Sequence, residues 1–325
     1  MPERAVEPAA HERERTASQR PLLGYALVLA AVTLWSIHGT VAKVVMESGG
    51  LSSLRLAEVR AAGAGLVIVA AVVLLRPRSL RLSAREGAYL LVFGVAGLAF
   101  VHFFYFAAIA RLDIGVALVI QYLAPVLVAA WARFFVHEPM RRRIWLALAT
   151  SFVGLCLVVE IWSGLALDTI GVAASLACAV SYALYLVMAD HSLRGGRDVY
   201  SLLAWGFLFA TLFWTIAQPW WGFPGGLLLE DTSLLGRLAD VRGPLWTLLV
   251  YVVVLGTVVP FILMVSALRY ITPTRAAIAA MAEPVLGAVV AFAWLGEELG
   301  AAQVAGGFLV LAGVALAQTA RGQGP

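Results

Sequence analysis

The sequence predicts an all-α polytopic membrane protein in which ten transmembrane helices form two inverted five-helix repeats. Hydrophobic residues make up 62% of the 325 residues, charged residues make up 13%, and the mean hydropathy is +0.91. No soluble core could hide so much apolar surface, whereas helices that face lipid need not hide it. An ungapped offset of 159 residues also aligns residues 97–160 with 256–319, which indicates an internal repeat.

The repeat rests on residues that are rare in apolar sequence. Under the offset, the matching residues are Pro125 with Pro284, Glu138 with Glu297, and Gly154 with Gly313. Ala, Leu and Gly coincide easily in apolar sequence, so the prolines and glutamates carry most of the weight. An internal repeat in a membrane protein points to transport, because two related halves can rock about a site between them.

The apolar runs define the expected spans. At about 20 residues per span, we place helices near 22–45, 54–75, 87–110, 114–136, 144–161, 169–189, 199–218, 245–268, 274–295 and 301–319. The expected organisation is a tail at 1–21, a first repeat at 22–161, a connection at 162–168, a second repeat at 169–319 and a tail at 320–325. The first run is too long for the apolar region of a signal peptide, so we expect a retained span.

Residues 219–243 are the long exception among short polar connections. They begin with Pro219-Trp220-Trp221-Gly222-Phe223-Pro224 and carry two leucine clusters among charged residues. Tryptophan suits the headgroup region, and the leucines favour a short helix lying on the membrane interface. A loop without regular structure is the alternative.

The arginines orient the helices. With the N-terminus in the cytoplasm, sixteen basic residues lie inside and only four lie outside. The four are Arg55, Arg111, Arg237 and Arg242. The positive-inside rule favours this arrangement, so we expect a multi-pass protein of the bacterial inner membrane with both termini in the cytoplasm. Because each repeat has five spans, Glu138 then faces the cytoplasm and Glu297 faces the exterior.

Polar groups at membrane depth are costly and usually face the bundle interior or water. Glu283 lies near the middle of the ninth span, and its repeat partner is Ala124. It is a candidate to bind a substrate or a proton, or it pairs with a neighbouring helix. Pro125 and Pro284 each release the carbonyl four residues earlier, in the first case that of Gln121. Such helix breaks offer carbonyls to a substrate or ion, or serve as packing kinks.

Three charged residues near the first hairpin are candidates for a gate or an ion pair. Lys43 and Glu58 lie at similar depth on either side of a short turn, which predicts an ion pair between them. Glu58 and Arg60 are two residues apart on a helix and point roughly 200° apart. Arg60 is therefore left to attract an anionic group or to pair elsewhere.

His38 and His102 lie in the first and third spans and have no His or Cys at ligand spacing nearby, so no metal site is predicted. A buried His usually makes hydrogen bonds between helices, although it could also relay protons. The aromatic candidates to line a cavity are Trp35, Tyr105, Tyr182 and Tyr185, each of which could equally be core filling. The two cysteines, Cys156 and Cys178, lie in apolar runs, which implies no disulfide or metal framework, and no cofactor is expected.

Several short segments together resemble one known family. The second half contains Ala267-Leu268-Arg269-Tyr270, Glu283-Pro284-Val285, Leu295-Gly296-Glu297-Glu298-Leu299 and Gln303, followed by a Gly-rich last span. The first half contains Leu34-Trp35, Arg60, Ala124-Pro125-Val126 and His137-Glu138-Pro139, and Ser181-Tyr182-Ala183-Leu184-Tyr185 places Tyr182 where Trp35 stands. The chain thus resembles proteins built on the EamA-type repeat of the drug/metabolite transporter superfamily. His137 stands where the repeat usually has Gly, and 219–243 is an insertion. The resemblance implies a transporter, but similar proteins export amino acids, carry sugars or metabolites, or have no known cargo.

Three function classes are compatible with these features. We expect a secondary active transporter of a small metabolite, foremost an exporter of amino acids or related zwitterionic or amphipathic compounds, with proton coupling as an option. The chain has no G-x-x-x-x-G-K-[ST] motif for an ATP motor. The alternatives are a membrane scaffold or sensor, and an intramembrane enzyme, for which neither H-E-x-x-H nor G-x-S-x-G occurs. The expected partners are a small-molecule substrate, the bilayer and a coupling proton, without nucleic acid, in a monomer or weak homodimer.

Overall fold

The structure is a computed structural model that describes residues 20–112, 114–138, 140–163 and 168–319. It is a bundle of long helices, and the prediction of an all-α polytopic membrane protein is confirmed. In order, its main helical elements are α2 (Pro21–Glu47), α3 (Ser53–Leu75), α4 (Ala84–Val92), η2 (Phe93–Ala99), α5 (Phe100–Ile109), α6 (Ile114–Gln121), α7 (Ala124–Phe134), α8 (Arg142–Val158), α9 (Thr169–Arg194), α10 (Val199–Ala217), α11 (Leu245–Val253), η7 (Val254–Val258), α12 (Val259–Ala267), α13 (Pro273–Ala280), α14 (Glu283–Leu295) and α15 (Ala301–Thr319). Short 3₁₀ turns lie at η1 (Pro77–Leu80) and η3 (Ile161–Ser163).

Polar residues in the connections start several of these helices. The Ser52 side chain caps α3, and Ser83 with Glu86 forms a reciprocal capping box at the start of α4. Asp168 and Asp198 accept hydrogen bonds from the first free backbone amides of α9 and α10. These caps satisfy N–H groups that have no partner within their own helix.

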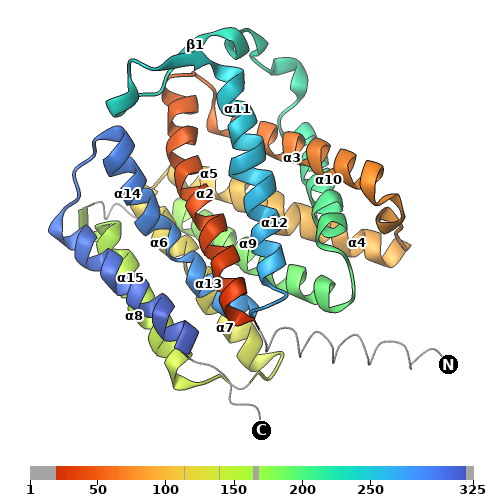
Figure 1. Cartoon of the computed structure of the whole chain (residues 1–325), viewed down its shortest axis with the longest axis vertical. Helices are drawn as coiled ribbons and strands as arrows, with labels where there is room; N and C mark the ends of the chain where they lie inside the picture. The colour runs from red at the N-terminus through yellow and green to blue at the C-terminus, as the bar shows by residue number, and fades with distance from the viewer. Residues whose placement is uncertain (1–19, 113, 139, 164–167, 320–325) are drawn as a thin grey trace.

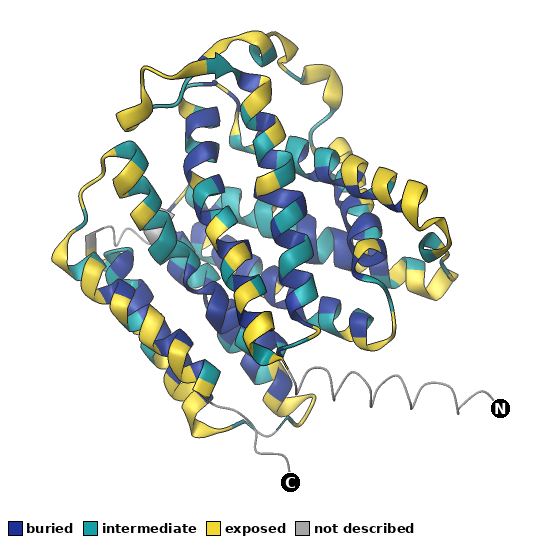
Figure 2. Ribbon diagram, in the orientation of Figure 1, coloured by how far each residue is buried: buried dark blue, intermediate teal, exposed yellow. Residues whose placement is uncertain are grey.

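Nine helices or helix pairs in the described part of the chain are long and apolar enough to cross a membrane. They correspond to nine of the ten expected spans. The remaining one corresponds to α8, which is 17 residues long and packs along α15. Figure 2 shows buried residues in the middle of the bundle and exposed residues on its outside. Large apolar side chains such as Leu66 and Leu74 are 73% and 80% exposed, as expected of helices that face lipid.

The bundle has two distinct ends (Figure 1). We call the end where α2 begins and α15 ends the termini end. The opposite end is covered by residues 218–244, which we call the cap. The cap contains η4 (Trp220–Gly222), η5 (Gly225–Leu229), β1 (Asp231–Ser233), η6 (Gly236–Leu238) and β2 (Arg242–Pro244).

The prediction for the cap segment was wrong in both of its forms. Instead of an interfacial helix or an irregular loop, β1 and β2 pair antiparallel between short 3₁₀ turns. Trp294 at the end of α14 donates a hydrogen bond through Nε1 to the carbonyl of Leu234 at 2.9 Å. The amide of Ser233 donates to Oγ of Ser48 at 3.0 Å, next to the end of α2. The segment is ordered by contacts with helices that are distant in sequence.

The contacts between α8 and α15 exchange under the repeat offset. A Cβ atom on Gly154 would lie 2.7 Å from the carbonyl oxygen of Gly306, and one on Gly313 would lie 2.8 Å from that of Ala147. Gly313 and Gly306 follow Gly154 and Ala147 by 159 residues. The two contacts are therefore the same contact made once from each repeat, as a two-fold relation between the halves requires.

The irregular backbone segments follow the same relation. Both η2 and η7 are π-helical, and η7 lies 159 residues after residues 95–99 of η2. A Cβ on Gly97 would lie 3.3 Å from Cα of Tyr185, and one on Gly256 would lie 2.5 Å from Nδ1 of His38. The first helices of the two repeats align at a different offset, 147 residues, which pairs Trp35 with Tyr182. At this offset His38 is equivalent to Tyr185. The structure thus supports one offset for the first helix of each repeat and another for the last three.

Candidate functional site

Two broken helices meet at the centre of the bundle. The first breaks between α6 and α7, and the second breaks between α13 and α14 at the equivalent position. α6 and α13 end at Gln121 and Ala280, the residues four positions before Pro125 and Pro284. Each proline then lies in the first turn of the next helix, where its missing N–H costs no hydrogen bond.

Glu283 is the first residue of α14 and lies at this junction. Its Oε2 atom accepts a hydrogen bond of 3.3 Å from the Tyr122 hydroxyl, which comes from the break between α6 and α7. Its backbone carbonyl accepts a second bond, of 2.8 Å, from Oγ of Ser36 on α2. Glu283 therefore connects the two breaks and the first helix. Tyr122 and Ser36 were missed in the sequence, where an apolar setting and a small side chain gave no signal.

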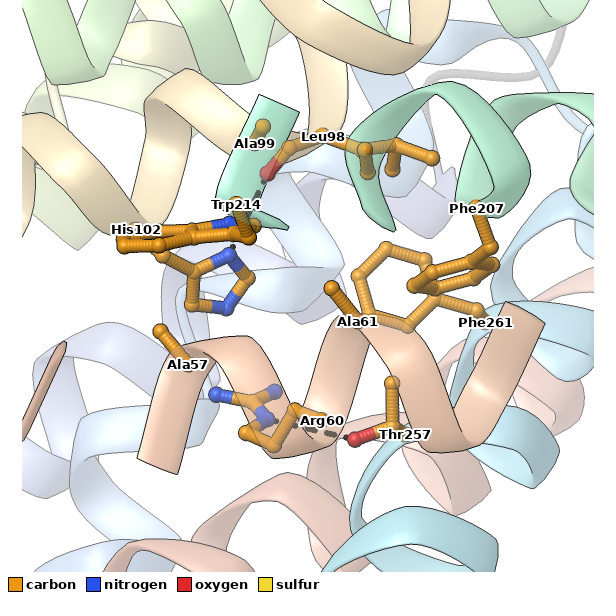
Figure 3. A pocket seen from close by; sticks show the side chains of 11 residues that line it. Ala57, Arg60, Ala61, Leu98, Ala99, His102, Phe207, Trp214, Thr257 and Phe261 are labelled. Atoms are coloured by element: carbon orange, nitrogen blue, oxygen red, sulfur yellow. Dashed lines mark hydrogen bonds between the residues drawn. The ribbon is translucent and has the colours of Figure 1, made fainter. Parts of the chain in front are cut away.

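Arg60 lies in the first half of α3, in the bundle interior. Its Nε donates a hydrogen bond of 3.2 Å to Oγ1 of Thr257 in the π-helical segment η7 (Figure 3). Thr257 is the one hydrogen-bond partner of this guanidinium among the described residues. Arg60 and Glu283 are near enough for their charges to interact, but they form no direct ion pair in the described part of the chain. A guanidinium has five N–H donors, so Arg60 keeps several for another ligand.

A small cavity separates Arg60 from His102 (Figure 3). The His102 ring nitrogen Nδ1 lies 3.2 Å from the carbonyl oxygen of Leu98, which leaves Nε2 on the other side of the ring. The cavity volume is about 10 Å³, which is room for about one water molecule. The other lining residues are Ala57, Ala61, Ala99, Phe207, Ala210, Trp214, Thr257 and Phe261. The centre is closed in this conformation.

Several residues that line this cavity occupy equivalent positions in the two repeats. In each such pair, one residue is polar and the other is apolar. Offset by 159 residues, His102 corresponds to Phe261 and Leu98 corresponds to Thr257. At the offset of 147 residues, Arg60 corresponds to Phe207. The two halves therefore contribute equivalent positions to one central space but fill them with different chemistry.

Most aromatic candidates gather around Phe261. The ring centroid of Trp35 lies 5.3 Å from that of Phe261, and the Tyr185 centroid lies 5.5 Å from it. Tyr182 stacks on Tyr185 with centroids 6.1 Å apart. These rings form an aromatic wall beside the central cavity. Tyr105 contacts Phe106 instead, with centroids 5.6 Å apart.

His38 and Gln121 have different neighbours. His38 is buried at 6% exposure, and its Nδ1 lies among the buried atoms without a hydrogen-bond partner in the described part of the chain. The side-chain oxygen of Gln121 accepts a bond of 3.3 Å from the Cys178 thiol, which also points at the Val101 carbonyl at 3.1 Å. Gln121 is therefore held by α9 rather than pointing freely into a cavity.

The predicted pair between Lys43 and Glu58 is not formed. Lys43 Nζ lies 2.8 Å from Oε1 of Glu297, and Glu58 Oε2 lies 2.7 Å from Nη1 of Arg55. Ser52 starts α3 early enough that Arg55 and Glu58 share one helix face at a spacing of three residues. Arg55 also donates to the Pro219 carbonyl at 3.0 Å, so this pair anchors the cap.

A second cavity opens at the termini end, between α4, α7, α9 and α13. Its volume is about 380 Å³. It is lined by Tyr89, Val128, Trp131, Ala132, Val136, Glu138, Val187, Met188, Asp190, His191, Arg194 and Pro273. We call this cavity the termini-end crevice. It is large enough to admit a small organic molecule, whereas the central cavity is not.

No group of three or more His, Cys, Asp or Glu side chains that could hold a metal ion occurs among the residues described. The polar groups described near the centre are a guanidinium, a carboxylate, three hydroxyls and two imidazoles.

Similar proteins agree with this architecture. An uncharacterized transporter of Archaeoglobus fulgidus is 28% identical over 213 residues, which cover 66% of this chain and 70% of the relative. The uncharacterized inner membrane transporter YicL of Salmonella typhimurium is 26% identical over 293 residues, or 89% of this chain and 93% of the relative. A solved crystal structure shares the fold with a TM-score of 0.72 at 20% identity, covering 91% of this chain and 96% of the other.

The family model of EamA-like transporters matches residues 22–160 and again residues 169–319. The two matches leave out only the ends of the chain and a short connection between the halves. Each match contains one broken helix and one π-helical segment. The chain therefore belongs to the EamA-like transporter family and is a membrane transporter.

Proposed function

We propose that this protein is a secondary active transporter of a zwitterionic small metabolite, foremost an amino acid or a related amphipathic compound. The observation that carries the proposal is a guanidinium in the bundle interior, Arg60, that makes one hydrogen bond among the described residues, to Thr257, while the carboxylate of Glu283 lies at the junction of the two broken helices. Arg60 would receive the carboxylate of the cargo. Glu283 would receive its amino group or, in the coupled alternative, the driving proton.

The closed centre supports alternating access. The space beside Arg60 holds about 10 Å³, so a metabolite can occupy it only after helices have moved apart. The broken helices and π-helical segments provide places where that movement can occur, because their backbone hydrogen bonding is already irregular. The crevice of about 380 Å³ at the termini end is the natural entrance in the present conformation.

Sidedness follows from charge. The excess of arginine at the termini end favours a cytoplasmic position for that end and an inner-membrane location for the protein. The conformation would then be inward-facing, with the crevice open to the cytoplasm. Export is the direction that we propose, because cytoplasmic metabolites would enter through this crevice.

Counterflow of labelled metabolites in proteoliposomes tests the proposal. The panel should contain an amino acid, its methyl ester and the matching carboxylic acid without the amine. The wild type should prefer the zwitterion. In Arg60→Gln, the concentration of unlabelled amino acid needed to compete with the labelled metabolite should rise about tenfold or more, because a charge-assisted hydrogen bond is lost. The concentration of ester needed should not change. Equal losses for the amino acid and the ester would contradict a carboxylate site at Arg60.

Family membership favours transport over a scaffold, a sensor or an intramembrane enzyme. The counterflow assay also distinguishes these classes, because a scaffold would exchange none of the compounds and an enzyme would change the label chemically. A pH gradient applied in the same vesicles tests proton coupling separately from cargo recognition.

A further inference from the structure

Two crevices of the bundle are related by the repeat. At the cap end, α14 packs along α2, and at the termini end, α7 packs along α9. The offsets pair α14 with α7 and α2 with α9. At the cap end, Lys43 Nζ lies 2.8 Å from Oε1 of Glu297 and Thr40 on α2 is only 5% exposed, so we treat this crevice as the closed one. The termini-end crevice is open and encloses about 380 Å³.

The charges at equivalent positions differ. Glu297 corresponds to Glu138, and Lys43 corresponds to Asp190 at the offset established by the first helix of each repeat. Both Glu138 and Asp190 line the termini-end crevice, and their charges act on each other. Where the closed crevice has an ammonium against a carboxylate, the open crevice has two carboxylates. Bringing them together needs either a shared proton or a positive charge between them.

Arg194 is placed to supply that charge. It lines the crevice one helical turn beyond Asp190, and its Nε lies 2.7 Å from Oδ2 of Asp190. Its side chain is 63% exposed, so it can reorient without breaking a packed core. A guanidinium has enough donors to bridge two carboxylates at once.

The other titratable groups around the crevice have contacts of their own. The Tyr89 hydroxyl donates to the Met188 carbonyl at 2.6 Å, and the His191 ring packs against the Tyr89 ring with centroids 5.9 Å apart. Arg275 lies on α13, two residues after Pro273, and has an interaction of its own. Arg194 is the one arginine or lysine among the described residues that line the crevice, and its exposed side chain can turn toward Glu138.

We propose that Arg194 is the gating cation of the termini-end crevice. It holds Asp190 while the crevice is open, and it bridges Asp190 and Glu138 when the crevice closes. The bridge is the counterpart of the pair between Lys43 and Glu297 at the other end. The proposal rests on alternating access, as proposed above, and adds the residues that decide which end is closed.

Cysteine accessibility tests the gate without knowledge of the cargo. Val187 lines the crevice, and its repeat partner Thr40 is only 5% exposed in the closed cap-end crevice. A Val187→Cys probe should therefore be labelled when the termini-end crevice is open and protected when it closes. The native cysteines are first replaced by Cys156→Ala and Cys178→Ala. A membrane-impermeant maleimide is added to inside-out vesicles, and the labelling rate is measured.

The variants should move the labelling rate in opposite directions. Lys43→Gln releases the cap-end pair and should lower labelling about two- to fivefold, the range expected from a half-exposed ion pair. Adding Arg194→Gln should reverse that fall, because the opposite crevice then loses its own bridge. Adding Asp190→Lys to this double variant places an ammonium at the position equivalent to Lys43 and should lower labelling again.

A matched control uses another half-exposed arginine at the same end. Arg269 is 48% exposed and lies outside the crevice lining, so Arg269→Gln in the Lys43→Gln background should change nothing. If adding Arg194→Gln leaves the labelling rate of the Lys43→Gln protein unchanged, the proposed gate is wrong. If Lys43→Gln itself has no effect, the cap-end pair does not hold its crevice closed and the proposed gate is overturned, whereas the proposed function is tested separately by counterflow.

Discussion

At the scale of single residues, the buried pair of Arg55 and Glu58 shows how strongly a charge in the bundle depends on its partner. Glu58 is fully buried, and Arg55 is 9% exposed. A carboxylate removed from water is tolerated only when a cation and hydrogen bonds compensate it. The Oε1 atom of Glu58 has no hydrogen-bond partner within the described chain, so Arg55 provides nearly all of that compensation.

We therefore expect Glu58→Gln to lower the thermal stability of the purified protein by about 3 kcal/mol, the cost of leaving one member of a buried pair alone. Arg55→Met added to Glu58→Gln should recover part of the loss, since no charge then remains buried. Lys43→Met should not recover it, because Lys43 pairs with Glu297. Recovery by Lys43→Met instead of Arg55→Met would show that Glu58 pairs with Lys43 and not with Arg55.

Glu283 is the residue on which cargo binding or coupling depends in our proposal. Glu283→Gln keeps the size of the side chain and can still accept the hydrogen bond from Tyr122. We expect it to abolish transport driven by a gradient while the protein stays folded and inserted. Exchange without a pH gradient should survive if Glu283 carries only the proton, and should be lost if it binds the cargo amine. Normal concentrative transport by this variant would make Glu283 structural.

At the scale of secondary structure, the sequence was informative wherever the physics is local. The apolar runs and prolines predicted helices and the positions of their breaks, because span length and the missing proline donor act within a few residues. The cap was missed because its pairing depends on distant partners such as Trp294 and Ser48. In the site, Arg60 and Glu283 were found as costly charges at membrane depth, whereas Tyr122 and the true partner of Lys43 required three-dimensional packing.

The close packing of α8 on α15 predicts a clear effect of one methyl group. A Cβ on Gly313 would meet the backbone of Ala147 and Ser151 within 2.9 Å, so Gly313→Ala should destabilise the protein by about 1–3 kcal/mol through overpacking. Gly39→Ala is the matched control, because a Cβ on Gly39 would have no atom within 4 Å. The control should be neutral or slightly stabilising, since alanine favours helix. Thermal unfolding in detergent measures both variants, and equal melting temperatures would argue against the tight helix contact.

At the scale of the whole molecule, the topology is open to a direct test. The sixteen-to-four distribution of basic residues predicts that both termini are cytoplasmic and that the cap is outside. A reporter enzyme active only outside the cytoplasm should be silent at the C-terminus. It should be active when inserted between Gly225 and Gly226, where added Cβ atoms would meet nothing within 4 Å. The reverse pattern would invert the assigned direction of every helix.

The unequal lining of the central cavity has a consequence for how such a protein can be assembled. If the two halves were identical chains related by a two-fold axis, Arg60 would face a second copy of itself across a space of about 10 Å³, and so would His102. Two cations on either side of so small a space in a dry interior would repel each other. The two-fold axis would also produce a second copy of every binding group. Joining the halves in one chain allows Phe207 and Phe261 to replace the second copies. Sequence divergence between the halves is thus what permits this symmetric scaffold to hold a one-sided site.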